Sequence, residues 1–100
     1  MNGGVCMLLQ PDMALLKVFL ENSEDCSQLS DDEYIADLYD ADNPLTLDII
    51  LTDQGAAIEA AARLIYDSEQ DGWYMGEQVE DEAEILAALN LTLAAFKANG

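Results

Sequence analysis

The strongest constraint on this chain is its charge, because 21 Asp and Glu residues stand against 3 Lys and Arg and give a formal net charge of −18 at pH 7. Like charges at this density repel one another and oppose compaction. A hydrophobic fraction of 51% still supplies the apolar side chains that can offset chain entropy, so we expect a folded chain. At 100 residues there is room for one modest core, and we expect a single domain over residues 1–100.

The same negative charge limits the kinds of partner that the chain can bind. Direct contact with DNA, RNA or an anionic membrane is disfavoured, and a basic protein or a cation is the natural counterpart. The apolar stretch over residues 5–20 is interrupted by polar residues and lacks a basic leader, so we expect neither a signal peptide nor a membrane span. Two cysteines without a CxxC spacing fit a reducing cytosol, and we expect a cytoplasmic protein. Without any His, catalysis has little support, and no cofactor or metal is expected.

Periodicity predicts a mainly α fold of four helices. The first covers residues 11–21, the second begins at Ser30, the third runs from residue 52 or 53 to residue 66, and the last covers residues 80–98. Residues 5–9 could be a strand or a buried lead-in, and residues 45–51 a strand or a short helix. A short two-stranded β element, and with it an α+β fold, therefore stays open.

The second helix is predicted from a capping-box pattern, Ser30 followed by Glu33. Helical spacing would then place Glu33, Asp37 and Asp40 on one face, opposite an apolar face. Charges on such a face would lie roughly 5 to 6 Å apart along the axis, against about 3.4 Å per phosphate along one DNA strand. The predicted helix face is thus a sparse imitation of a phosphate backbone.

Two groups of acids contain no Lys or Arg, and we take them as candidate partner-binding residues. The first group contains Asp31, Asp32, Glu33, Asp37 and Asp40, and the second contains Glu77, Glu80, Asp81, Glu82 and Glu84. An ordinary solvated surface is the alternative for each, as is adaptation to high salt. The near absence of basic residues favours a binding role.

A second kind of candidate is aromatic. Trp73 and Tyr74 follow the acidic stretch in what we expect to be a loop, and they could be either contact residues or core residues. Asp67, Glu69 and Asp71 occupy EF-hand-like positions, but Met75 and Gln78 stand where further ligands belong, so a solvated turn is preferred over a calcium site. Small residues around Leu91 on the last helix could pack on another element or on a second copy, which leaves a homodimer possible.

In its small size and in the acids at Asp31-Asp32-Glu33, Asp37, Asp40, Glu80-Asp81-Glu82 and Glu84, the chain resembles acidic phage and mobile-element proteins that disarm bacterial defences. These are the DNA-mimic anti-restriction proteins and the acidic anti-CRISPR proteins. The resemblance rests on composition and acid clustering. It implies an inhibitor whose acids occupy the Lys and Arg channel of a nucleic-acid-binding complex and block target DNA binding. The competing hypothesis is an adaptor or oligomerisation module that binds through Trp73 and the last helix.

Overall fold

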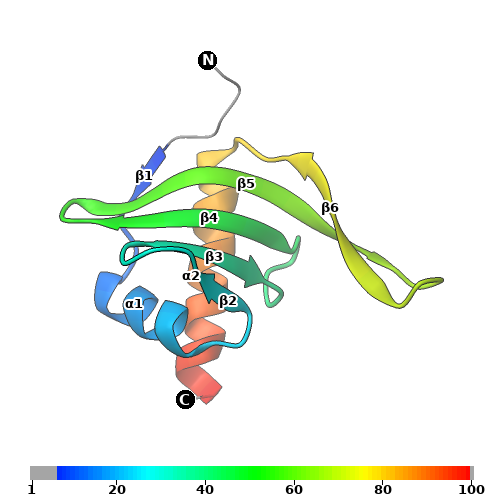
Figure 1. Ribbon diagram of the computed structural model, residues 1–100, viewed down its shortest axis with the longest axis horizontal. Helices are drawn as coiled ribbons and strands as arrows, with labels where there is room; N and C mark the ends of the chain where they lie inside the picture. The colour runs from blue at the N-terminus through cyan, green and yellow to red at the C-terminus, as the bar shows by residue number, and fades with distance from the viewer. Residues whose placement is uncertain (1–6, 100) are drawn as a thin grey trace.

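The computed structural model describes residues 7–99 as an antiparallel sheet of six strands with two helices on one face (Figure 1). The elements in chain order are β1 (Met7–Leu9), α1 (Met13–Asn22), β2 (Cys26–Gln28), β3 (Glu33–Leu38), β4 (Leu45–Thr52), β5 (Gly55–Asp67), β6 (Gly72–Gln78) and α2 (Glu82–Asn99). The predicted mainly α fold of four helices is therefore wrong, since 43% of the described residues are in strands and 30% are in helices.

The sheet is organised around β5, its longest strand. The strand order is β1-β5-β4-β3-β2, and β6 also pairs with β5. The first part of β5 pairs with β1 at Ala56–Ile58, and its last part pairs with β6 between Ala62 and Asp67. Two strands therefore share one edge of β5, and the β5–β6 hairpin extends beyond the helices (Figure 1).

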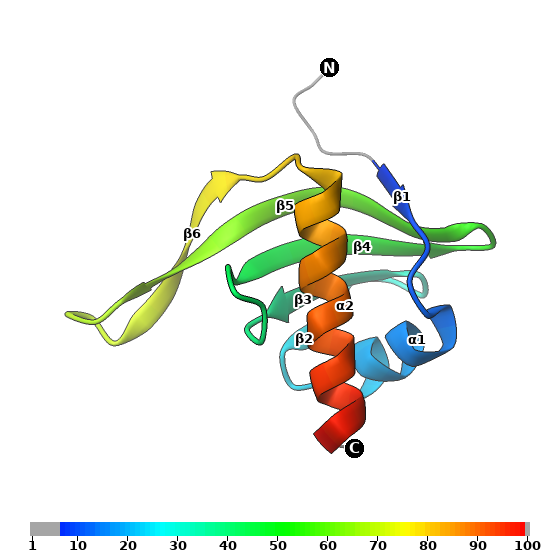
Figure 2. The same cartoon turned by 180° about the vertical axis from the view of Figure 1, so that it is seen from behind.

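The core lies between the helices and one face of the sheet. Seen from behind, α2 lies across the strands with α1 beside it (Figure 2). Alternate residues of the central strands point into this layer, and a stripe on each helix meets them. The buried side chains include Tyr34, Ala36 and Leu38 on β3, Leu45, Leu47 and Ile49 on β4, Leu16, Phe19 and Leu20 on α1, and Ile85, Leu89 and Leu93 on α2. An edge-to-face contact between Phe19 and Phe96, with centroids 5.4 Å apart, joins the two helices.

The first and last predicted helices are confirmed. Asp12 caps α1 by accepting a hydrogen bond from the backbone N–H of Leu15 at 3.1 Å. Asp81 acts similarly for α2, accepting from the backbone N–H groups of Ala83 and Glu84 at 3.0 and 3.3 Å. Of the apolar run over residues 5–9, Met7–Leu9 is the strand β1, and the rest lies outside the described residues.

The second and third predicted helices are strands instead. The region after Ser30 forms β3, and residues 55–67 form β5. Ser30 Oγ does accept the backbone N–H of Glu33 at 3.2 Å, but this contact closes the turn before a strand. Residues 45–51, for which strand and helix were both open, belong to the strand β4.

Gly55 starts β5 with a φ of +146°, a conformation that residues with a Cβ rarely adopt. A Cβ at this position would also collide with the carbonyl oxygen of Leu9 on β1. The glycine therefore lets β1 approach the start of β5 and pair with it.

Candidate functional site

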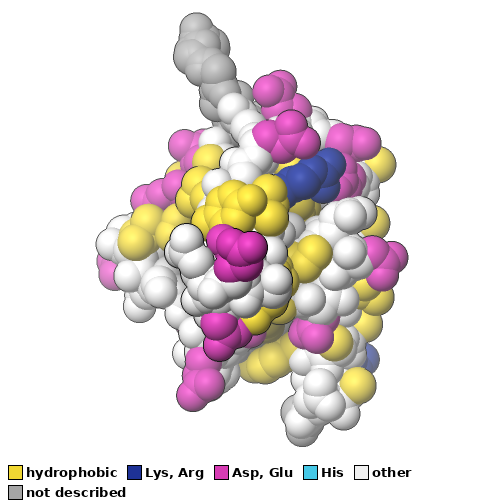
Figure 3. Space-filling view, turned by 90° about the vertical axis from the view of Figure 1, so that its right-hand side faces the viewer, with side chains coloured by type: hydrophobic (Ala, Val, Ile, Leu, Met, Phe, Trp, Pro, Cys, Tyr) yellow, Lys and Arg dark blue, Asp and Glu magenta, His cyan; other side chains and the backbone are white. Residues whose placement is uncertain are grey.

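The exposed end of the β5–β6 hairpin, together with Tyr39 directly after β3, carries a group of large apolar side chains. We call it the hairpin patch, and its members are Tyr39, Ile65, Tyr66, Trp73, Tyr74 and Met75, which are between 37% and 68% exposed. Trp73 is at its centre, with its ring centroid 5.1 Å from that of Tyr39 and 5.3 Å from that of Tyr66. Viewed from this end, hydrophobic side chains gather in the middle of the surface with acidic side chains around them (Figure 3).

Strand pairing explains why the patch covers both faces of the hairpin. Tyr66 pairs with Trp73 and Ile65 pairs with Tyr74, so successive cross-strand pairs point to opposite sides. The hydroxyl of Tyr66 donates to Asp71, and this hydrogen bond raises the pKa of Tyr66. The hairpin is thus internally ordered while its apolar surface stays exposed.

This arrangement answers the question that the sequence left open for Trp73 and Tyr74. The expected loop is wrong, because both residues lie in β6. At 45% and 53% exposed, neither is a core residue. Tyr39, Ile65 and Tyr66 of the patch were not predicted as contact residues, because only the folded chain brings them to this end of the sheet.

The structure separates the first group of acids by environment. Asp31 and Asp32 are exposed in the turn before β3, and Asp40 is exposed after it. Glu33 and Asp37 are half-buried on β3. The helical face proposed for Glu33, Asp37 and Asp40 is wrong, and along a strand four residues span about 13 Å. The spacing that imitated phosphates is therefore lost.

The second group of acids has largely internal roles. Glu84 of α2 accepts from Arg63 Nη1 at 2.6 Å and from Nη2 at 3.3 Å, and Oε1 of Glu77 lies 3.6 Å from Arg63 Nε. Asp81 caps α2, as described above. Glu80 and Glu82 are exposed at the start of α2. Of this group, only these two are free of the contacts that hold β5, β6 and α2 together in the described structure.

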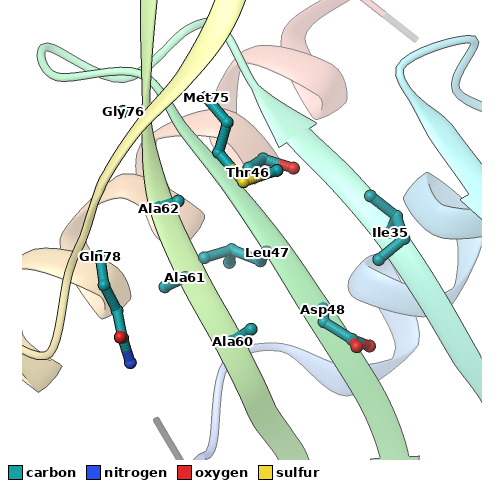
Figure 4. Close-up of a pocket in the computed structure, with 10 residues that line it drawn as sticks. All are labelled: Ile35, Thr46, Leu47, Asp48, Ala60, Ala61, Ala62, Met75, Gly76 and Gln78. Atoms are coloured by element: carbon teal, nitrogen blue, oxygen red, sulfur yellow. The ribbon is translucent and has the colours of Figure 1, made fainter. Parts of the chain in front are cut away.

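The sheet face opposite the helices has a hollow of about 360 Å³ that sequence analysis did not anticipate. β3, β4 and β5 form its floor, and β6 curves over one side of it (Figure 4). Its lining comprises Ile35, Thr46, Leu47, Asp48, Ala60, Ala61, Ala62, Met75, Gly76 and Gln78. Met75 also belongs to the hairpin patch, so the hollow and the patch are continuous.

Asp48 is the acidic residue in this lining. It pairs with Ile35 on β3 and Ala60 on β5, and its Oδ1 atom is buried without a hydrogen-bond partner. Burial is the main cause that raises the pKa of Asp48 to about 6, followed by the neighbouring carboxyl group of Glu33. A carboxylate is thus held in a place that disfavours its charge.

The acidic turn at the hairpin tip differs from an EF-hand. It joins two strands, and Asp67 Oδ1 accepts the backbone N–H of Glu69 at 2.9 Å. Asp71 accepts from Tyr66. Within residues 7–99, no three His, Cys, Asp or Glu side chains are grouped so that they could hold a metal ion.

Comparison with known proteins adds no relative, because no protein-family model, curated protein or solved structure matches the chain. Among the described residues no helix is long and apolar enough to cross a membrane. The hairpin patch, the hollow and the charge are therefore the features of the molecule that bear on its function.

Proposed function

We propose that this chain is a binding module, not a catalyst, and that it docks through the hairpin patch onto a positively charged surface of another protein. The observation that carries the proposal is the exposed aromatic surface around Trp73, on a hairpin that neither α1 nor α2 covers. Contiguous apolar patches on folded domains commonly mark interaction sites. Aromatic side chains are also the residues that most often dominate binding energy at protein interfaces.

The distribution of exposed apolar residues supports this choice of site. Ten large hydrophobic side chains are exposed among the described residues, and six of them form the hairpin patch. The other four, Leu8, Val18, Leu29 and Leu91, are scattered over β1, the helices and the loop after β2. Scattered apolar residues are normal on a surface, whereas a concentration at one end requires an explanation.

The charge determines the chemistry of the partner. Two copies of a chain with a charge of −18 repel each other, whereas a basic surface is attracted to it and is steered toward it. The patch would supply the anchor, and the surrounding acids would supply orientation and association rate. We therefore favour a basic protein over a second copy of this chain.

A homodimer remains the competing arrangement, with the outer face of α2 as its surface. Leu91 is 43% exposed there, next to the exposed Ala87 and Ala94. Sedimentation velocity at low and high salt tests it, because screening would strengthen such a dimer. A monomer at both salt concentrations would exclude the dimer.

In a more specific version of the proposal, the partner surface is the nucleic-acid-binding surface of a bacterial defence complex. The chain would then be an anti-CRISPR or anti-restriction inhibitor that blocks the binding of target DNA. The observation that favours it is the surplus of acids, since the ion pairs of Arg63 involve only Glu77 and Glu84. In this version the exposed acids Asp31, Asp32 and Asp40 contribute as much as the patch. We place the interaction in the cytoplasm, which the two-cysteine composition fits.

The test is a pull-down from bacterial lysates that contain restriction or CRISPR complexes, with low-salt and then high-salt washes. Three variants are compared with the wild type: Trp73→Ala, the triple charge reversal of Asp31, Asp32 and Asp40 to Lys, and Asp53→Asn as a control at the far end of the sheet. Far-UV circular dichroism confirms that each variant is folded.

Recovery of a basic partner that is lost with Trp73→Ala and kept with Asp53→Asn supports docking through the patch. Salt-released recovery of a nucleic-acid-binding complex that is lost with the triple reversal supports the inhibitor version. Recovery of no partner, or of a partner that Trp73→Ala keeps fully, contradicts the proposed docking surface.

A further inference from the structure

The hollow beside the hairpin patch has the shape and chemistry of a side-chain receptor. At about 360 Å³ it is at the lower end of the size range of ligand sites in proteins. Ala60 and Ala62 keep its floor open because they are small, and Met75 forms a flexible wall. An unbranched apolar chain would fit such a surface.

The carboxylate of Asp48 gives the hollow a preference for a hydrogen-bond donor. Its buried Oδ1 has no partner, and the residues that flank it in register, Ile35 and Ala60, have no side-chain donor. Glu33, two residues before Ile35 on β3, points to the same face and adds a second carboxyl group. A buried oxygen without a donor carries a cost in free energy, which an incoming cationic donor would remove.

We propose that the hollow receives an arginine side chain of the basic partner, with the guanidinium on Asp48 and Glu33 and the methylene groups against Ala60, Ala62 and Met75. The inference rests on the proposed function, because it names the partner side chain that enters beside the patch. A guanidinium is weakly hydrated and offers five donors, which suits two neighbouring carboxyl groups in a half-buried site better than a compact ammonium does.

A second copy of this chain does not supply the arginine. Arg63 is the only arginine in the sequence, and it binds Glu84 of its own α2. The arginine must therefore come from a different protein, in agreement with the charge argument for the partner.

The test uses small probes and the intact chain, so it does not require the partner. Protein with ¹³C-labelled Ala, Ile and Met methyl groups is titrated with butylguanidinium, butylammonium and butyrate, and methyl shifts are followed by NMR. The wild type is compared with Asp48→Asn and with the control Asp53→Asn, which changes the charge equally in the β4–β5 turn.

We expect butylguanidinium to shift the methyl signals of Ala60, Ala62 and Met75 in the wild type and in Asp53→Asn. Its affinity should fall about tenfold in Asp48→Asn, as the loss of a charge-assisted hydrogen bond predicts. Butylammonium should bind more weakly, and butyrate should not bind.

The arginine site would be overturned if Asp48→Asn binds butylguanidinium as tightly as the wild type does. It would also be overturned if the methyl shifts are spread over the surface and do not include residues of the hollow. Equal binding of butylammonium would overturn the preference for arginine. Both outcomes are distinct from a failure of the proposed function, which depends on Trp73→Ala in the pull-down.

Discussion

Asp48→Asn should stabilise the folded protein at neutral pH, although it replaces a residue of the proposed site. The folded sheet raises the pKa of Asp48 from 3.8 to about 6, mainly through burial and then through Glu33. Because the folded-state pKa exceeds the unfolded-state pKa, this group contributes most to stability below about pH 4. That contribution is lost as the pH rises through about 6.

The size of the effect follows from the shift. About two pKa units correspond to roughly 3 kcal/mol at most, at about 1.4 kcal/mol per unit. Asp48 is partly exposed and solvent screens part of the effect, so we expect Asp48→Asn to raise the free energy of unfolding by about 1 to 2 kcal/mol at pH 7.5. Asparagine can also donate a hydrogen bond to Glu33, which the ionised aspartate cannot do.

The assay is urea unfolding followed by far-UV circular dichroism at pH 7.5, 6.5 and 5.5. Removal of any acid from a chain with a charge of −18 relieves general repulsion, so Asp53→Asn serves as the reference at each pH. The advantage of Asp48→Asn over Asp53→Asn should be largest at pH 7.5 and should shrink toward pH 5.5. Equal stability of the two variants at pH 7.5, or a difference that does not change with pH, would refute the reasoning.

Two further predictions concern the core and the cysteine. Leu89→Ala, at a fully buried position on α2, should lower the free energy of unfolding by about 2 to 5 kcal/mol in urea titrations. Leu91→Ala, on the exposed face of the same helix, should change it by less than about 0.5 kcal/mol. Similar losses in the two variants would place the core elsewhere. Burial raises the pKa of the Cys26 thiol to about 12. At pH 8 the reaction of this thiol with iodoacetamide should therefore be at least about tenfold slower in the folded protein than in urea. Equal rates would contradict the burial of Cys26.

The helices could be predicted from the sequence because their signals are local. Both have an aspartate at the cap and an apolar stripe at helical spacing, and neither depends on a distant strand for its hydrogen bonds. The strand β4 also shows its period of two, since Leu45, Leu47 and Ile49 are its buried apolar positions.

The error at β5 has a physical cause. Its sequence between Gly55 and Arg63 is rich in alanine, the best helix former, and its apolar residues point in all directions when placed on a helix. The same composition suits a strand that pairs on both edges and has small residues on its open face. Tertiary pairing with β4, β1 and β6 overrides the local propensity, and none of these partners can be read from the strand itself.

At β3 the predicted helix is wrong, although the sequence contains a strand pattern. Tyr34, Ala36 and Leu38 alternate with Glu33 and Asp37, which is the pattern of a half-buried strand. The capping-box pattern at Ser30 favoured a helix, yet the same hydroxyl–amide contact forms in the turn. Because Asp48 and Met75 come to line one hollow only through the pairing of β4, β5 and β6, the hollow could not have been predicted before the sheet was known.

The hairpin patch and the site of Asp48 are the two features least favourable to a stable monomer, and they lie next to each other. The hairpin patch exposes aromatic side chains to water, and Asp48 holds a carboxylate where burial disfavours its charge. Met75 belongs to both, so one partner segment could cover the patch and reach the hollow. Local departures from optimal packing and electrostatics tend to coincide with functional sites. A basic partner would correct both at once, since it would exclude water from Trp73 and supply the donor that Asp48 lacks. For this reason we expect Asp48→Asn to fold more stably and bind more weakly, a combination that a purely structural role for Asp48 does not predict.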